Sequence, residues 1–373
     1  MSVLRDYAAA VSQPTLPFAS ATPRYDEVVD ADGALRPAWQ GLASLALGLT
    51  RDELDRVDGE ISRFLADDGV SYARAGDDLQ PWQLDPMPFV LDAAGWARLD
   101  VGLAQRAELL NALLADLYGP QVVIRERIVP AAVILGHAGF VRAMARRDGE
   151  SLPPELLLSA TDLGRDAAGE WRVLADRVQA PSGLGYAAEN RRVISQVLPD
   201  LLDEGALHRM DPYFAALRAA LIAAAPDATT SPRIVVLSPG PLSETAFDQA
   251  FIANALGFPL VQGSDLVVRD GAVWMKPAGW PQRAPRERVD VILRRVDAEW
   301  CDPLELRSGS RLGVAGLTEA VRRGRVRVVN GLGAGVLETP ALFPYLPAVC
   351  ERLLGVQLRL PSVPAWWLGD PAA

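Results

Sequence analysis

The chain has 373 residues, a formal net charge of −10, 50% hydrophobic residues and 23% charged residues. This composition predicts a soluble globular protein of two or three domains and excludes a disordered chain. The negative charge argues against general binding to a phosphate backbone, so we expect no nucleic-acid partner. Because no apolar run reaches the roughly 18 residues that span a bilayer, we expect no membrane partner.

Cysteine and histidine are scarce, with two residues of each. Cys301 and Cys350 are too few for a disulfide framework or a zinc cluster. Together with a start that is a poor secretory signal, this predicts a cytoplasmic protein. His137 and His208 are likewise too few for histidine-based metal sites or a Ser-His-Asp triad. We interpret Cys301 as a core thiol and His137 as a buried structural histidine.

Residues 1–120 are predicted to form a mostly helical N-terminal region. The segment Gly41–Val70 has apolar residues at helical spacing, and Thr50 with Glu53 forms a capping box. The segment Gly95–Pro120 is a second amphipathic helix, which Gly119 and Pro120 end.

Short β-branched runs alternate with helical patterns from about Gln121 onward, which predicts an α/β fold of mixed sheets with flanking helices. Asp270-Gly271 lies between two apolar runs and predicts a β-hairpin. We divide this part into residues 121–230, with a hairpin and helices, and an α/β domain at 231–373. The strands are expected at 121–124, 131–136, 171–176, 233–238, 258–263, 265–270, 272–277, 289–297 and 325–330. The helices are expected at 190–202, 211–225, 244–256 and 317–323.

Charged residues lie at the open ends of a predicted hairpin around residues 160–178. Asp162 and Arg165 end the first run, and Asp176-Arg177 ends the return strand. Because facing strands lie ~5 Å apart, these carboxylates could grip a hard cation such as Mg²⁺. The alternative is a surface hairpin with solvated charges.

The turn Pro181-Ser182-Gly183 follows this hairpin and precedes the polar cluster Glu189-Asn190-Arg191-Arg192. Its backbone N–H groups could face an anion. A further strand-to-helix connection, with a helix beginning near Ser243, is either an anion site or an ordinary loop.

Two strand ends carry further polar side chains. Arg294, Arg295 and Asp297 end a buried strand, which is where open α/β sheets bind ligands, although an internal salt-bridge network is the alternative. We expect one arginine to face a site and the other to face solvent or a partner acid. Asn330 precedes a glycine-rich run that could wrap a phosphate or form a flexible turn. Lys276 could pair with a phosphate or simply be solvated.

Six long motifs occur in an order that resembles the circularly permuted ATP-grasp family of type 2, which is related to glutathionylspermidine synthetases. They include "VLADRVQAPSGLGYAAENR" and "VILRRVDAEWCDPLELR", and the similarity runs from about Tyr25 to Asp370. The motifs occupy residues 102–121, 173–191, 235–276, 291–307, 310–338 and 360–370.

The resemblance implies an ATP-dependent ligase with partial circularly permuted ATP-grasp architecture. ATP would phosphorylate a peptide- or amino-acid-like carboxylate, an amine would displace the phosphate, and Mg²⁺ would bridge the phosphates. It implies metal ligation by Asp162 and Asp176, and catalytic roles for Arg294, Arg295 and Asp297. The implied nucleotide-binding residues are Ser182, Gly183, Glu189, Asn190, Arg191 and Asn330, to which we add Lys276 from its position late in a strand.

The sequence departs from the family pattern in two places. Where relatives have a Glu-x-Asn-like magnesium element, this chain has Ala175 and Arg177, which leaves Asp176 as the substitute acid. The family continues beyond the Trp366-Trp367 segment into the second half of the grasp, so we expect a missing C-terminal domain or a partner protein. The alternative is a non-catalytic binding or scaffold module that retains the fold.

Overall fold

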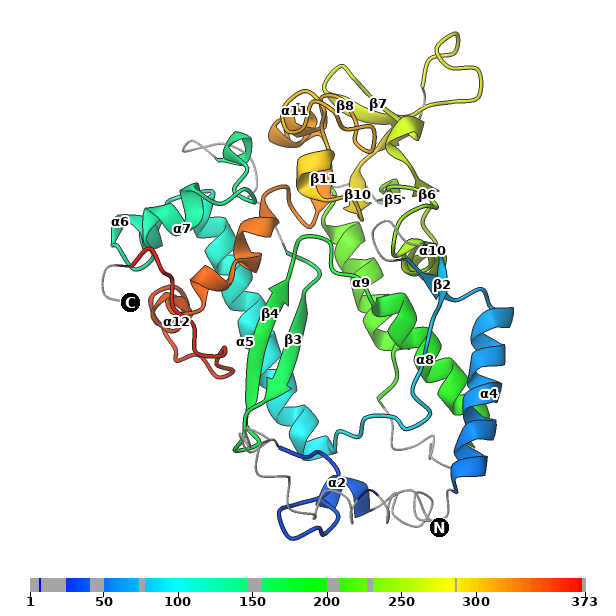
Figure 1. Cartoon of the computed structure of the whole chain (residues 1–373). Coiled ribbons are helices and arrows are strands. Elements are labelled where there is room, and N and C mark those ends of the chain that lie inside the picture. The colour runs from blue at the N-terminus through cyan, green and yellow to red at the C-terminus, as the bar shows by residue number, and fades with distance from the viewer. Residues whose placement is uncertain are drawn as a thin grey trace. The chain divides into compact units, whose positions relative to one another are not determined.

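The computed structural model describes residues 7, 25–40, 50–73, 78–145, 156–199, 208–226, 231–285 and 287–370. These residues form a mixed α/β fold with parallel and antiparallel sheets, as the sequence predicts (Figure 1). The chain forms two compact units. Unit 1 comprises Met1–Asp100, Gly164–Trp171 and Leu184–Met210, and unit 2 comprises Val101–Leu163, Arg172–Gly183 and Asp211–Ala373. The three-part division expected above stays a prediction.

Unit 1 is built around two helices that pack together, α4 and α8. The predicted capping box is confirmed, because the Thr50 side chain accepts from the Glu53 N–H and the Glu53 carboxylate accepts from the Thr50 N–H. The apolar face of α4 buries Val57, Ile61 and Leu65. The elements are α2 (Pro37–Gln40), α4 (Arg51–Asp67), β1 (Ser71–Tyr72), β2 (Gln80–Pro81) and α8 (Leu184–Val197).

A four-stranded parallel sheet forms the centre of unit 2, with the strand order β11-β10-β5-β6 (Figure 1). Every residue of β5 and β10 is buried, which explains why their sequences do not alternate between apolar and polar residues; only the last residue of β10, Arg294, is polar. Helices α9 and α10 pack against this sheet. The strands are β5 (Ile234–Leu237), β6 (Leu260–Val261), β10 (Val291–Arg294) and β11 (Arg327–Val329).

A three-stranded antiparallel sheet, β7-β8-β9, also belongs to unit 2. The hairpin predicted at Asp270-Gly271 is confirmed, because Arg269 pairs with Ala272. Asp270 and Gly271 have φ angles of 53° and 75°, as a two-residue type I′ turn requires. The strands are β7 (Leu266–Arg269), β8 (Ala272–Met275) and β9 (Glu287–Val289). The hairpin predicted around residues 160–178 is likewise present, as β3 (Ala160–Arg165) and β4 (Trp171–Arg177).

The long helix α5 (Ala93–Leu117) confirms the second predicted helix. The strands expected at 121–124 and 131–136 are wrong, because these runs form the short helices α6 and α7. Short apolar runs do not distinguish a strand from a buried helical turn. The other helices are α6 (Val122–Arg125), α7 (Ala131–Leu135), α9 (Asp211–Ala223), α10 (Ala246–Leu256), α11 (Leu317–Arg322) and α12 (Leu346–Leu354). The 3₁₀ helices are η1 (Arg142–Met144), η3 (Gly263–Asp265), η4 (Ala298–Trp300), η5 (Ala334–Glu338) and η6 (Pro340–Leu342).

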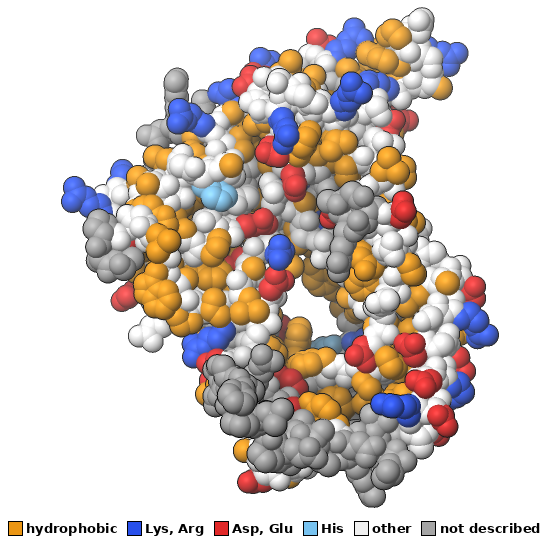
Figure 2. Space-filling view, in the orientation of Figure 1, with side chains coloured by type: hydrophobic (Ala, Val, Ile, Leu, Met, Phe, Trp, Pro, Cys, Tyr) orange, Lys and Arg blue, Asp and Glu red, His pale blue; other side chains and the backbone are white. Residues whose placement is uncertain are grey.

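Surface charge is mixed rather than segregated on the face drawn in Figure 2, where arginines lie singly among acidic side chains. Among the described residues, no helix combines the length and apolar character needed to cross a membrane.

Candidate functional site

Asp162 lies on β3 of the hairpin and faces Arg177 on β4. The Asp162 Oδ2 accepts a hydrogen bond of 2.9 Å from Arg177 Nη2, and the two side chains are 46% and 61% exposed. Exposed ion pairs contribute only about 0–1 kcal/mol. The Asp162 carboxylate can therefore leave Arg177 at little cost.

Asp176, on β4, is held instead by a buried arginine of α5. Arg106 donates from Nε and Nη2 to the two carboxylate oxygens of Asp176, at 2.7 Å each, and both side chains are 1% exposed. The same guanidinium donates to the Leu360 carbonyl and to the Ser362 hydroxyl. Arg106 thus joins α5, β4 and a C-terminal segment, which also makes a parallel bridge from Ser362 to Val173.

The two predicted metal ligands are thus paired with different arginines, and their role in holding a metal stays a prediction. Both carboxylate oxygens of Asp176 are already engaged by Arg106. Across the described part of the chain, no three His, Cys, Asp or Glu side chains gather as a metal site would require. Asp162 alone fits the mode in which Mg²⁺ is held mainly by substrate phosphates with one carboxylate.

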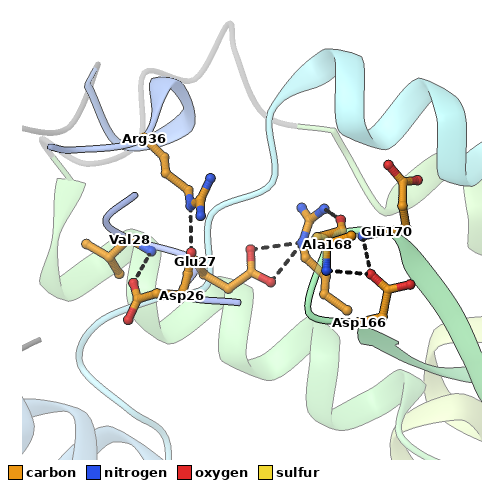
Figure 3. Close-up of polar contacts among 9 residues, drawn as sticks. Asp26, Glu27, Val28, Arg36, Asp166, Ala168 and Glu170 are labelled. Carbon is orange, nitrogen blue, oxygen red and sulfur yellow. Dashed lines mark hydrogen bonds and ion pairs between the residues drawn. The ribbon is translucent and has the colours of Figure 1, made fainter. Parts of the chain in front are cut away.

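The connection at the tip of the hairpin belongs to unit 1, where its charges have structural partners (Figure 3). Arg165 donates to the Glu27 carboxylate at 2.8 Å and to the Gly169 carbonyl. The Asp166 carboxylate accepts hydrogen bonds from the N–H groups of Ala168 and Glu170. The Arg165 guanidinium also stacks on Trp171, 4.1 Å from the ring centre. These charges therefore shape the turn and join it to the Glu27 segment.

The segment that leaves β4, residues 178–183, is fixed along the carboxyl edge of the parallel sheet. The Glu338 Oε1 accepts from the N–H groups of Val178 and Gln179, at 2.7 and 2.6 Å. The Gln179 side chain accepts from the Ala298 N–H at 3.2 Å, just past the end of β10. Arg295 Nη2 donates to the carbonyl of Pro181. Three segments far apart in the sequence, 178–183, 294–298 and 330–338, therefore meet in unit 2.

Asn330, the residue after β11, joins residues 157–158 to the 178–183 segment through its buried side-chain amide. Its Nδ2 donates to the carbonyls of Leu158 and Val178, at 2.7 and 2.5 Å. Its Oδ1 accepts from the N–H groups of Leu157 and Leu158, at 3.0 and 3.1 Å. The amide is therefore engaged by the protein backbone, and its predicted role in holding a nucleotide remains a prediction.

Arg294 is buried and holds the start of the glycine-rich run through main-chain carbonyls. Its guanidinium donates to Asn330 O at 2.8 Å, to Val296 O at 3.0 Å and to Gly331 O at 3.4 Å. Burial lowers the pKa of Arg294, and the nearby Cys301, Asp297 and Glu338 oppose that shift. Arg294 therefore positions the loop that begins at Asn330.

Arg295 is also buried, but its guanidinium is only partly satisfied. Besides Pro181, Nη2 faces Asp248 Oδ2 at 3.4 Å, and Nε has no hydrogen-bond partner. Burial lowers its pKa, and the nearby Asp248 carboxylate opposes this shift. One of the two arginines was expected to face solvent or a partner acid. Arg295 has such an acid, Asp248, beside it. Neither arginine is exposed.

Four predicted site residues lie at the surface or are only partly buried. Ser182 and Asp297 are exposed, and no side-chain hydrogen bond is made by either one within the described residues. The Lys276 Nζ donates to the Ser264 carbonyl at 2.7 Å. Gly183 has a φ of +115°, and a methyl group added there would meet nothing within 4 Å. Ser182, Gly183 and Asp297 are therefore open to a ligand.

The remaining predicted residues, Glu189, Asn190 and Arg191, lie on α8 in unit 1. Glu189 is buried and pairs with Arg192, whose pKa this contact raises. The Asn190 side chain accepts from Trp82 Nε1 at 2.8 Å, and Arg191 donates to the His208 carbonyl at 2.7 Å. Each of the three has a partner within its own unit, and their predicted roles stay predictions.

The glycine-rich run is buried from Gly331 to Leu337, and its predicted role around a phosphate stays a prediction. The Tyr118 hydroxyl donates to the Gly333 carbonyl at 3.1 Å, and a Cβ on Gly333 would overlap that hydroxyl. Glycine is required here because the tyrosine approaches the backbone and φ is +97°. Cys301 is a core thiol as expected, and burial raises its pKa to about 11.

The sequence interpretation missed Arg106, Gln179 and Glu338. Arg106 carries a signal that could have found it, because it lies on the same helical stripe as Leu109, Leu110, Leu113 and Leu117, which are all buried. A charge within an apolar stripe needs a buried partner. Gln179 and Glu338 act on backbone groups and carry no comparable signal.

The chain is similar to several proteins of known sequence. The family described as "Circularly permuted ATP-grasp type 2" matches residues 88–373. An uncharacterized protein of Mycobacterium tuberculosis is 48% identical over 358 residues, which cover 92% of this chain and 40% of that protein. An uncharacterized protein of Synechocystis is 35% identical over 348 residues, with 92% and 70% covered.

Among solved structures, a glutathione synthetase-like effector (GSS30) from Globodera pallida, in its apo form, has a TM-score of 0.47 at 11% identity. The similarity covers 81% of this chain and 69% of that one. The chain spans about 40% of the length of the mycobacterial relatives that it matches at 48% identity. The extent of the family match identifies the chain as a member of the circularly permuted ATP-grasp type 2 family.

Proposed function

We propose that this chain belongs to an ATP-dependent ligase that joins a peptide- or amino-acid-like carboxylate to an amine. Family membership supports the use of ATP. The observation that carries the proposal is the meeting of residues 178–183, 294–298 and 330–338 at the carboxyl edge of a parallel sheet. Open α/β sheets bind their ligands at this edge.

In the proposed reaction a carboxylate oxygen attacks the γ-phosphorus of ATP, and ADP leaves. The amine nitrogen then attacks the acyl carbon, inorganic phosphate leaves and the amine loses a proton. ATP, when bound, supplies the phosphoryl group that turns the carboxylate into an acylating group. Asn330 and Arg294 hold the loops in place through backbone contacts, and Ser182, Gly183 and Asp297 remain open for reactants.

A second candidate is a binding or scaffold module that retains the fold without the chemistry. Two points favour it: Ala175 stands where the family resemblance implies a glutamate, and Asp176 is paired with Arg106. This candidate predicts that the protein binds ATP but forms no acyl phosphate.

The test uses the natural protein at its full length, with Mg·ATP and a mixture of amino acids, small peptides and amines. Hydroxylamine is added to trap an acyl phosphate as a hydroxamate, and ADP release is followed in parallel. We expect both products, and we expect Asp162→Asn to lose nearly all of this turnover. The matched control is Arg177→Gln, which breaks the same exposed ion pair but keeps the carboxylate, and it should retain turnover.

The outcomes separate the two candidates. Tight ATP binding by calorimetry without ADP or hydroxamate, whatever the acceptor, would favour the binding module. Full turnover in Asp162→Asn would remove Asp162 from the mechanism. Equal losses in Asp162→Asn and Arg177→Gln would show that only the ion pair matters.

A further inference from the structure

The order in which the chain adds strands to the parallel sheet of unit 2 reverses between β5 and β10. The chain passes from β5 to β6 on one side of β5, and later places β10 and then β11 on the other side. In open parallel sheets, the point where the strand order reverses is where ligands bind, beyond the carboxyl ends of the two strands. The residues that follow these ends are Ser238 after β5 and Arg295 after β10.

Arg295 is the residue at this point whose hydrogen-bonding capacity is unfilled. Its side chain is 2% exposed, yet the Nε–H has no acceptor. Leaving a buried polar group without a partner costs about 1–3 kcal/mol, and more for a charged group. The adjacent Arg294 differs, because three carbonyls accept from its guanidinium. An acceptor for Arg295 is therefore missing among the described residues.

The helix that follows β5 adds a second favourable feature for an anion. Helix α10 has eleven residues, and its N-cap residue, Thr245, makes no side-chain capping hydrogen bond. The preceding loop is held in place, since Gln249 accepts from Ser238 Oγ and donates to Ser243 Oγ and Thr245 Oγ1. A helix N-terminus favours negative charge. Asp248, in the first turn of α10, supplies one such charge, but at 3.4 Å from Arg295 it makes a long contact.

We propose that Arg295 and the N-terminus of α10 form a receptor for one oxyanion of a reactant, a substrate carboxylate or a nucleotide phosphate. The proposal rests on the proposed ligase function, in which both groups take part. The oxyanion accepts from the Arg295 Nε–H. When no ligand is bound, the Asp248 carboxylate balances the positive charge of the Arg295 guanidinium. Asp248 therefore competes with the ligand for Arg295. Removing the Asp248 charge then strengthens binding, which a purely structural ion pair does not predict.

The experiment measures binding and thermal stability of the chain with three probes: N-acetyl-L-alanine, its neutral amide, and inorganic phosphate. We expect one or both anions to bind and raise the melting temperature, and the amide to do neither. Asp248→Asn should bind the anion several-fold more tightly, and Arg295→Gln should lose binding. Arg352→Gln removes an arginine from an exposed pair with Glu126 and should bind as the unchanged chain does.

Binding of N-acetyl-L-alanine would identify the ligand group as a carboxylate, and binding of inorganic phosphate would identify it as a phosphate. The proposal is overturned if neither anion binds, if the amide binds equally well, or if Asp248→Asn binds no more tightly than the unchanged chain. Should Arg295→Gln fail to fold, the comparison of Asp248→Asn with Arg352→Gln decides the question. The ligase proposal fails separately, through absent ADP and hydroxamate in a protein that still binds the anion.

Discussion

Replacing Asp176 with asparagine is expected to lower the free energy of unfolding by about 3–5 kcal/mol, because it leaves the buried guanidinium of Arg106 without its counter-charge. Both side chains of this pair are 1% exposed, and Arg106 also holds Leu360 and Ser362. The loss should therefore extend to the contact between β4 and the C-terminal segment. Urea denaturation of the two proteins measures the difference.

Two further variants give this prediction its controls. Arg106→Met with Asp176→Leu removes both charges, and it should recover much of the lost stability because no charge is left buried alone. Asp162→Asn breaks the exposed pair on the same hairpin and should cost about 1 kcal/mol or less. If Asp176→Asn is as stable as the unchanged chain but binds Mg²⁺ more weakly, Asp176 is a metal ligand and the structural interpretation is wrong.

The regular parts of the fold were predictable where local signals agree with the final packing. The strands β5, β10 and β11 are rich in β-branched residues. The Asp270-Gly271 turn needs two positive φ angles, which this pair tolerates. The segments 121–124 and 131–136 were not predictable in the same way. Their apolar residues suit a strand or a helical turn equally, and tertiary packing decides between them.

The candidate site was predictable as a set of segments but not as a set of contacts. The positions of Arg294 and Arg295 after a buried strand follow from the sequence. Which of the two satisfies carbonyls and which lacks an acceptor depends on loops that approach from residues 181 and 330. Asp176 shows the same limit, because its partner lies 70 residues away on α5. Spacing along the chain does not reveal such pairs.

Asn330→Asp is expected to lower the free energy of unfolding by about 3 kcal/mol or more at neutral pH, although the two side chains have nearly the same shape. The change removes both Nδ2 donors and places a carboxylate against the carbonyls of Leu158 and Val178. Burial disfavours the charged form, so the loss should shrink as the pH falls and the new carboxyl group takes up a proton. The measurement is urea denaturation of the variant and the unchanged chain at a series of pH values. Asn254→Asp, at an exposed position of α10, should change stability by about 0.5 kcal/mol or less. A small, pH-independent loss in Asn330→Asp would mean that its amide does not hold residues 157–158 and Val178 in place.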